Sequence, residues 1–271
     1  MRVQPNIVRK GQGLPLVAVH GNGVDHRLLL PLDDDLAASG SWERIYLDLP
    51  GFGLTPPLDA AGGLPELADW LVETVHELVG DEPFALLGSS LGGLLARYVV
   101  TRFPDQVLGL ALIAPVVDPA PSRRVRPERS LVVRDQDLLR SLPPADAEEF
   151  TSVAARQTQE SWDAFRVHAL PGIRAADPDA MGRLSQRYFL RASPDTAGTF
   201  QGPTLILTGR QDHVVGYEDQ FALLTHYPRA TYLALDGAGH NVHLEQPRMV
   251  GTALRDWGRC VQAASGGVVE V

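Results

Sequence analysis

Short apolar runs alternate along the chain with longer segments in which hydrophobic residues recur every three or four positions. The short runs are typical of buried strands, and the longer segments have the period of amphipathic helices. We predict strands at residues 14–19, 44–49, 84–87, 107–114, 204–208 and 230–235. Helices are expected between residues 64 and 78, after residue 88, over 217–225 and over 247–261. Nearly continuous apolar strands that alternate with helices are typical of a parallel sheet covered on both faces.

The stretch from residue 115 to residue 203 breaks this alternation, because it contains no convincing strand. Structureless loops longer than about 15 residues are uncommon inside compact domains. Apolar residues at helical spacing are visible in the middle of the stretch. We therefore expect one discontinuous core domain, residues 1–115 and 203–271, with a helical insertion at residues 116–202 before the penultimate core strand.

Composition places the 271 residues among ordinary globular proteins, with 44% hydrophobic and 21% charged residues. The longest nearly unbroken apolar run, from Leu108 to Val117, is about half as long as a membrane-spanning helix. The N-terminus lacks the apolar core of a secretory signal, so we expect a cytoplasmic protein without membrane attachment. The net charge of −9 argues against a nucleic-acid partner, which usually requires a basic face.

The motif Gly88-Ser89-Ser90-Leu91-Gly92 lies between an apolar strand and a helix. In this setting the small residues beside Ser90 let the chain turn sharply, and the hydroxyl then projects at the C-terminal edge of the sheet. The following helix directs backbone N–H groups toward any negative charge there. The motif alone also fits a glycine-rich turn of a Rossmann-like unit, so its meaning depends on partner residues elsewhere.

A serine nucleophile needs a general base, and the base needs an orienting carboxylate. Asp212 follows the strand predicted at residues 204–208, and His240 follows the last predicted strand. Together with Ser90 they come from three strand ends, which meet at the edge where open α/β sheets bind ligands. We predict that Ser90 is the nucleophile, His240 the base and Asp212 the acid. Asp118, after the fourth predicted strand, is an alternative acid.

Acyl transfer also requires two N–H donors for the oxyanion of the tetrahedral intermediate. The backbone N–H of Leu91, the residue after the nucleophile, is one candidate. We assign the other to Asn22, in the loop His20-Gly-Asn-Gly after the first predicted strand. No cofactor is implied. A metal is not expected either. Four histidines show no ligand spacing, namely His76, His168, His213 and His226, and the His-x-x-His pair of His240 and His243 lies in a loop. A single cysteine, Cys260, makes no metal cluster.

These motifs together resemble the α/β-hydrolase family, in particular its lid-bearing esterases, lactonases and carbon–carbon bond hydrolases. The resemblance covers nearly the whole chain and rests on five segments in family order and spacing: His20-Gly-Asn-Gly, Asp48-Leu-Pro-Gly-Phe-Gly, Gly88-Ser-Ser-Leu-Gly-Gly, Gly209-Arg-Gln-Asp and Gly239-His. It implies the α/β-hydrolase fold, a mostly parallel sheet flanked by helices, with residues 116–202 as a lid over the active site. The family usually opens with a strand pair, whereas the chain before Gly11 has room for about one strand.

The resemblance implies a serine hydrolase that acts on a small-molecule carboxylic ester through an acyl-enzyme, as a monomer or homodimer. A serine at position 90 excludes the aspartate-nucleophile dehalogenases and epoxide hydrolases of this fold. Carbon–carbon bond hydrolysis or lactone opening is the alternative, although Asn241 stands where many carbon–carbon hydrolases have tryptophan. A non-catalytic ligand-binding protein is an alternative of another class, which the complete set of Ser90, Asp212 and His240 disfavours.

Other residues are expected to line the substrate pocket. His26 lies shortly after the oxyanion loop, Phe52 lies in the Pro-Gly-Phe-Gly turn that faces the pocket in the family, and Val214 lies just past the predicted acid. His243 is expected to be structural. An arginine of the insertion that reached a substrate carboxylate would favour carbon–carbon cleavage, and the candidates are Arg174, Arg183, Arg187 and Arg191.

Overall fold

The computed structural model describes residues 3–59 and 62–265. Its centre is a seven-stranded sheet with the order β1-β3-β2-β4-β5-β8-β9. The strands are β1 (Ile7–Lys10), β2 (Leu14–Val19), β3 (Trp42–Leu47), β4 (Phe84–Ser89), β5 (Val107–Ile113), β8 (Thr204–Gly209) and β9 (Ala230–Leu235). Only β1 runs antiparallel, to β3, and all other pairs in this sheet are parallel. The mostly parallel sheet flanked by helices that the resemblance implies is confirmed, and residues 3–10 contain one strand, β1.

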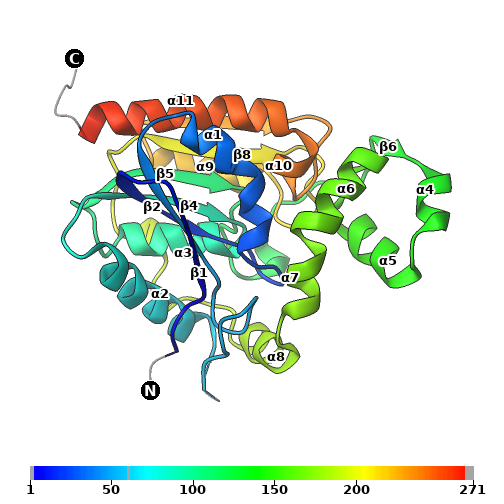
Figure 1. Cartoon of the computed structure of the whole chain (residues 1–271), viewed down its shortest axis with the longest axis horizontal. Coiled ribbons are helices and arrows are strands. Elements are labelled where there is room, and N and C mark those ends of the chain that lie inside the picture. Colours follow the sequence, from blue (N-terminus) through cyan, green and yellow to red (C-terminus); the bar gives the residue numbers. More distant parts are fainter. Residues whose placement is uncertain (1–2, 60–61, 266–271) are drawn as a thin grey trace.

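Helices cover both faces of the sheet (Figure 1). On one face lie α2 (Leu64–Val79) and α3 (Leu91–Val100), and on the other lie α1 (Asp33–Ala37) and α11 (Pro247–Ser265). Side chains alternate between the faces along each strand. Val17 and Val19 therefore pack into the cluster with α2 and α3, whereas Leu16 and Ala18 pack into the cluster that contains Trp257 of α11. Burial on both faces explains why these strands are continuous apolar runs in the sequence.

Between β5 and β8 the chain forms the insertion, residues 116–202. Its helices are α4 (Gln136–Ser141), α5 (Pro144–Val153), α6 (Gln159–His168), α7 (Leu170–Ala175) and α8 (Pro178–Gln186), with 3-10 turns η2 (Pro121–Arg123) and η3 (Pro194–Thr196). Figure 1 shows α4, α5 and α6 projecting to one side of the sheet. Two short strands, β6 (Val133–Arg134) and β7 (Arg156–Gln157), pair in parallel. The sequence did not reveal them, because two residues are too few for an alternating pattern.

An apolar cluster attaches the insertion to the core. Phe150 of α5 packs against both Trp162 and Phe165 of α6, with ring centroids 5.4 Å from each. The same cluster includes Leu28 of η1 (His26–Leu32) and Leu244 of α10 (Val242–Glu245). The insertion is thus packed on the segments that follow β2 and β9. The remaining helices, α9 (Glu218–Ala222) and η4 (Leu223–Thr225), connect β8 to β9.

No helix within residues 3–59 and 62–265 has the length and apolar character needed to cross a bilayer. Beside the apolar cluster, the buried His243 donates from Nε2 to the carbonyl oxygen of Leu28 across 2.9 Å. This hydrogen bond joins α10 to η1.

The buried His243 makes stability depend on pH. Burial lowers the pKa of this imidazole from 6.5 to about 4. As the pH falls below 6.5 the unfolded chain takes up a proton at this position, whereas the folded chain does so only near pH 4. Stability that is fully present above pH 6.5 is therefore lost as the pH falls toward 4, by up to about 1.4 kcal/mol per pH unit.

The substitution H243Q removes this titration, while its amide nitrogen can still donate to Leu28. We expect the free energy of unfolding, measured by urea titration between pH 7 and pH 5, to fall less steeply with pH in the variant than in the wild type. If the free energy of unfolding fell equally steeply with pH in the two proteins, His243 would take up a proton equally well in the folded and unfolded chains.

Candidate active site

Ser90 lies in a sharp turn between β4 and α3. Its backbone has φ 52° and ψ −115°, in a region that L-residues other than glycine rarely adopt. Hydrogen bonds hold this conformation, because the Ser90 N–H donates to Ile113 and the Ser90 carbonyl accepts from the N–H groups of Val116 and Gly93, all within 2.9–3.0 Å. Strained backbone of this kind clusters at functional sites. The turn matches the strand–turn–helix setting that the sequence predicts.

Close packing of α3 on β2 depends on Gly92. A Cβ atom added at Gly92 would lie 2.1 Å from the carbonyl oxygen of Val19 and 2.5 Å from that of His20. Only a residue without a side chain lets the first turn of α3 approach the end of β2 so closely. This approach brings the residues after Ser90 next to the loop that follows β2.

The structure brings Ser90, His240 and Asp212 together. Nε2 of His240 lies 3.0 Å from Oγ of Ser90, and Nδ1 lies 2.9 Å from Oδ2 of Asp212. His240 follows β9, and Asp212 follows β8. The other oxygen of Asp212 accepts the backbone N–H groups of Val214 and Val215 at 2.8 and 3.0 Å, so the fully buried carboxylate has partners for both oxygens.

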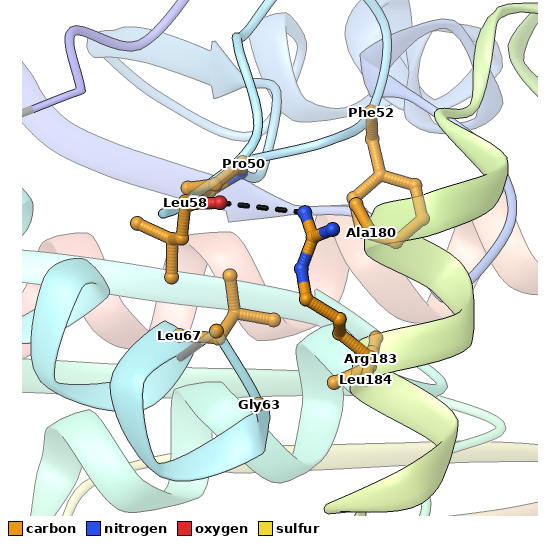
Figure 2. Close-up of a pocket in the computed structure, with 9 residues that line it drawn as sticks. Pro50, Phe52, Leu58, Gly63, Leu67, Ala180, Arg183 and Leu184 are labelled. Atoms are coloured by element: carbon orange, nitrogen blue, oxygen red, sulfur yellow. Dashed lines mark hydrogen bonds between the residues drawn. The ribbon is translucent and has the colours of Figure 1, made fainter. Parts of the chain in front are cut away.

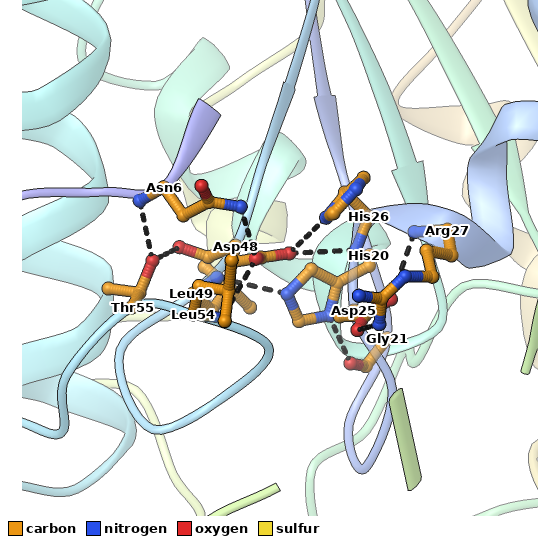
Figure 3. A network of polar contacts seen from close by, with 10 residues as sticks. All are labelled: Asn6, His20, Gly21, Asp25, His26, Arg27, Asp48, Leu49, Leu54 and Thr55. Carbon is orange, nitrogen blue, oxygen red and sulfur yellow. Dashed lines mark hydrogen bonds and ion pairs between the residues drawn. The ribbon is translucent and has the colours of Figure 1, made fainter. Parts of the chain in front are cut away.

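The loop after β2 is held beside Ser90 by the ring of His20. The N–H of Leu49 donates to Nε2 of His20, and Nδ1 of His20 donates to the carbonyl of Gly21 (Figure 3). Burial lowers the pKa of His20, which keeps the ring neutral for this pair of hydrogen bonds. A Cβ atom on Gly21 would lie 3.7 Å from Oγ of Ser90, so the loop backbone passes close to the hydroxyl. Asn22 therefore lies near Ser90.

A cavity of about 270 Å³, here called the Ser90 cavity, lies beside Ser90, His240, Asn22 and Asn241. Its volume is near the lower end of ligand pockets, roughly 300–1,000 Å³. The insertion supplies most of the apolar lining, through Val153, Phe165, Ala169, Ile173, Ala176 and Met181. A larger hollow of about 520 Å³ lies between β9 and α11, and its lining includes none of Ser90, Asp212 and His240.

His26 does not line the Ser90 cavity. Its backbone N–H and its Nδ1 lie 2.9 and 2.8 Å from Oδ1 of Asp48, in the buried polar network of Figure 3. Burial by itself would raise the pKa of Asp48, but the donors His26, Asn6 and Leu54 outweigh it and lower that pKa. Asp25, His26 and Asp48 lie close enough to hold a metal ion. However, these hydrogen bonds and those from Arg27 to Asp25 already satisfy their carboxylates.

Phe52 and Val214 also lie outside the lining of the Ser90 cavity. Phe52 is buried against a separate space of about 20 Å³ between the loop after β3 and α8 (Figure 2). Such a space holds about one water molecule. Val214 packs against the core cluster, and its N–H orients Asp212. His26, Phe52 and Val214 were expected to line the substrate pocket, but none of them lines the Ser90 cavity. Each side chain contacts other partners instead.

The alternative acid, Asp118, does not contact His240. Its carboxylate binds Nε of Arg123 at 2.6 Å, and this hydrogen bond holds the pKa of Asp118 below its ordinary value. None of the four candidate arginines of the insertion lines the Ser90 cavity within the described residues. They instead bind partners elsewhere: Arg174 binds Asp146, Arg183 binds the carbonyl of Leu58 (Figure 2), Arg187 binds Glu66, and Arg191 binds Asp69.

Glu245, at the end of α10, is a residue of the site that the sequence analysis missed. Its two carboxylate oxygens accept the N–H groups of Gly239 and Arg156, each at 2.7 Å. The side chain therefore joins the loop that carries His240 to β7 of the insertion. Burial raises the pKa of Glu245 to about 7, against the opposing effect of these backbone donors. Nothing in the sequence distinguishes this buried carboxylate from a solvated one.

A strained serine after a central strand, with a histidine and a buried carboxylate at two neighbouring strand ends, defines an α/β-hydrolase site. The family model described as "Alpha/beta hydrolase family" matches residues 16–252. The chain therefore belongs to the α/β-hydrolase family, and the resemblance found in the sequence is confirmed.

Individual relatives are similar over nearly their full length. The pimeloyl-[acyl-carrier protein] methyl ester esterase of Shewanella woodyi is 26% identical over 265 residues, which cover 91% of this chain and 94% of that protein. The (E)-2-((N-methylformamido)methylene)succinate hydrolase of Acinetobacter baylyi is 25% identical, over 92% of this chain and 91% of that protein. The crystal structure of an α/β superfamily hydrolase from Oenococcus oeni PSU-1 aligns with a TM-score of 0.87 and 25% identity, over 97% of this chain and all of that one.

The substitution Gly92→Ala tests the packing of α3 on β2. We expect it to lower the free energy of unfolding by about 2 kcal/mol or more, because the new methyl group would meet backbone oxygens that cannot rotate away. Gly182→Ala in α8 is the matched control. Its methyl group would meet nothing within 4 Å, and we expect it to be neutral or to stabilise by up to about 1 kcal/mol. Equal effects in urea unfolding would contradict this account.

Proposed function

We propose that this protein is a serine hydrolase that cleaves small-molecule carboxylic esters through an acyl-enzyme. The observation that carries the proposal is the hydrogen-bonded series from Ser90 through His240 to Asp212 at the edge of a ligand-sized cavity. Both distances, 3.0 and 2.9 Å, are within the range needed for proton transfer and for orienting the base.

In the first half of the reaction, Oγ of Ser90 attacks the ester carbonyl while Nε2 of His240 accepts its proton. Asp212 holds Nδ1–H of His240, which selects the tautomer with a free Nε2 and stabilises the imidazolium that forms. The N–H groups of Val214 and Val215 fix the Asp212 carboxylate in turn. His240 then gives the proton to the leaving alcohol, and a water activated by the same histidine releases the acid.

The backbone N–H groups of Asn22 and Leu91 stabilise the oxyanion of each tetrahedral intermediate. Leu91 begins α3 directly after Ser90, and Asn22 belongs to the loop that His20 holds beside the hydroxyl. The donors come from two segments, and the close approach of α3 to β2 at Gly92 supports their meeting at one point.

The insertion, residues 116–202, acts as a lid in this proposal, over a core formed by residues 1–115 and 203–271. Its side chains supply most of the apolar wall of the Ser90 cavity. An apolar wall excludes water from the reacting carbonyl and strengthens the electrostatic interactions at the site.

Three observations favour ester cleavage over carbon–carbon cleavage. The Shewanella woodyi relative is named as a methyl ester esterase. The arginines proposed for a carbon–carbon substrate bind partners away from the Ser90 cavity, and Asn241 lines the cavity directly after His240.

Hydrolysis of p-nitrophenyl esters from acetate to decanoate tests the proposal. We expect turnover in the wild type and a loss of at least about 10⁴-fold in kcat for Ser90→Ala, because the nucleophile is removed. The circular dichroism spectrum of the variant should match that of the wild type, which shows that the loss is not due to misfolding. Equal turnover by the two proteins would refute the serine mechanism.

A second pair of variants tests the assignment of the acid. D212N is expected to reduce kcat by about 10³–10⁴-fold, since an asparagine favours the unproductive tautomer of His240. D118N is the control and should retain wild-type kcat, because Asp118 contacts Arg123 rather than His240. The reverse order of effects would transfer the role to Asp118.

A further inference from the structure

The Ser90 cavity has an unusual distribution of charge. Apart from His240, the only ionisable side chain that lines it among the described residues is Glu149 of α5. Within the same part of the chain, no lysine or arginine lines the cavity. The cavity therefore offers a negative charge and no compensating cation to a ligand.

The lining includes buried apolar residues and exposed polar residues. Leu28, Phe165 and Ala169 are buried, so part of the apolar wall lies in the interior. Glu149 and Ser152 are exposed, so they lie where the cavity meets solvent. No salt bridge pairs the Glu149 carboxylate with a cation in the described part of the chain. Its charge is free to act on a ligand at the mouth.

We propose that the Ser90 cavity selects esters whose acyl group is uncharged, and that Glu149 excludes acyl groups that end in a carboxylate. This inference rests on the proposed function, because it specifies the substrate class of the same site. It names Glu149 as a specificity-determining residue.

The physical argument has two parts. A carboxylate that enters an apolar cavity loses its hydration without gaining a hydrogen-bonded cation, which disfavours binding. A second carboxylate at the mouth adds repulsion, which is stronger near the low-dielectric wall than in bulk water. Discrimination by a repulsive group is a common way to build specificity. The Acinetobacter baylyi relative, by contrast, is named for a succinate derivative, which is a dicarboxylate.

Three p-nitrophenyl esters of similar acyl length separate charge from size. They are the monoester of glutarate, which is anionic, its methyl ester, which is neutral, and the ester of 4-(trimethylammonio)butyrate, which is cationic. We expect wild-type kcat/KM for the anionic ester to be at least about tenfold below that of the neutral ester, where tenfold corresponds to about 1.4 kcal/mol. The cationic ester should be cleaved better than the anionic one.

The variants Glu149→Gln and Glu148→Gln assign the effect to one residue. Glu148 is the neighbouring exposed glutamate of α5 and does not line the cavity, so it controls for a general change of surface charge. Glu149→Gln should raise the anionic-to-neutral ratio of kcat/KM at least about threefold, whereas Glu148→Gln should leave it unchanged. Raising the salt from about 20 to about 500 mM should raise the same ratio in the wild type and have less effect in Glu149→Gln.

The outcomes distinguish this inference from the proposed function. Serine-dependent cleavage of the anionic ester as fast as the neutral ester would overturn the inference and leave the serine hydrolase intact. A ratio that does not respond to Glu149→Gln would overturn the role of Glu149. Cleavage that persists in Ser90→Ala, or no cleavage of any ester, would overturn the proposed function and the inference with it.

Discussion

The left-handed backbone of Ser90 is the constraint on which the rest of the site depends. A serine with φ 52° is strained, and it persists because hydrogen bonds to Ile113 and Val116 hold the residue at the end of β4. The turn places the hydroxyl beside Nε2 of His240 and starts α3 at the next residue. The close packing at Gly92 then sets the distance between α3 and the loop after β2. The conformation of Ser90 and the missing side chain of Gly92 together place α3 beside the loop after β2.

The Ser90 cavity is lined by both the core and the insertion, and two kinds of contact hold these two parts together. Leu28 and Leu244 of the core pack among the aromatic residues of the insertion. Glu245 links the His240 loop to β7 by hydrogen bonds from Gly239 and Arg156. Because these contacts border the His240 loop, a shift of the insertion would change both the cavity wall and the surroundings of the histidine.

The buried carboxylates of this region are satisfied largely by backbone N–H groups. Asp212 accepts two of them, Glu245 accepts those of Gly239 and Arg156, and Asp48 accepts backbone and side-chain donors together. A buried carboxylate without such donors would be strongly destabilising. Peptide groups also have fixed positions, so they orient these carboxylates more rigidly than flexible lysine or arginine side chains would. Glu149 differs, because it is exposed and lacks an ion pair in the described chain.

The sequence by itself determined the six parallel strands and the main helices of the core, the α/β-hydrolase fold class through its resemblance to that family, and the serine, aspartate and histidine that the structure brings together. The strands and helices follow from local periodicity, whereas the fold class and the three site residues follow from short family-like motifs at the strand ends and from their order along the chain. Only the tertiary structure decided which side chains face the cavity. His26 contacts Asp48, and Phe52 lies against α8. The residues around Glu149 and Glu245 come from segments about 60 to 130 residues away in the sequence. Side-chain direction in loops follows from such distant contacts, and these leave no periodic signal in the sequence.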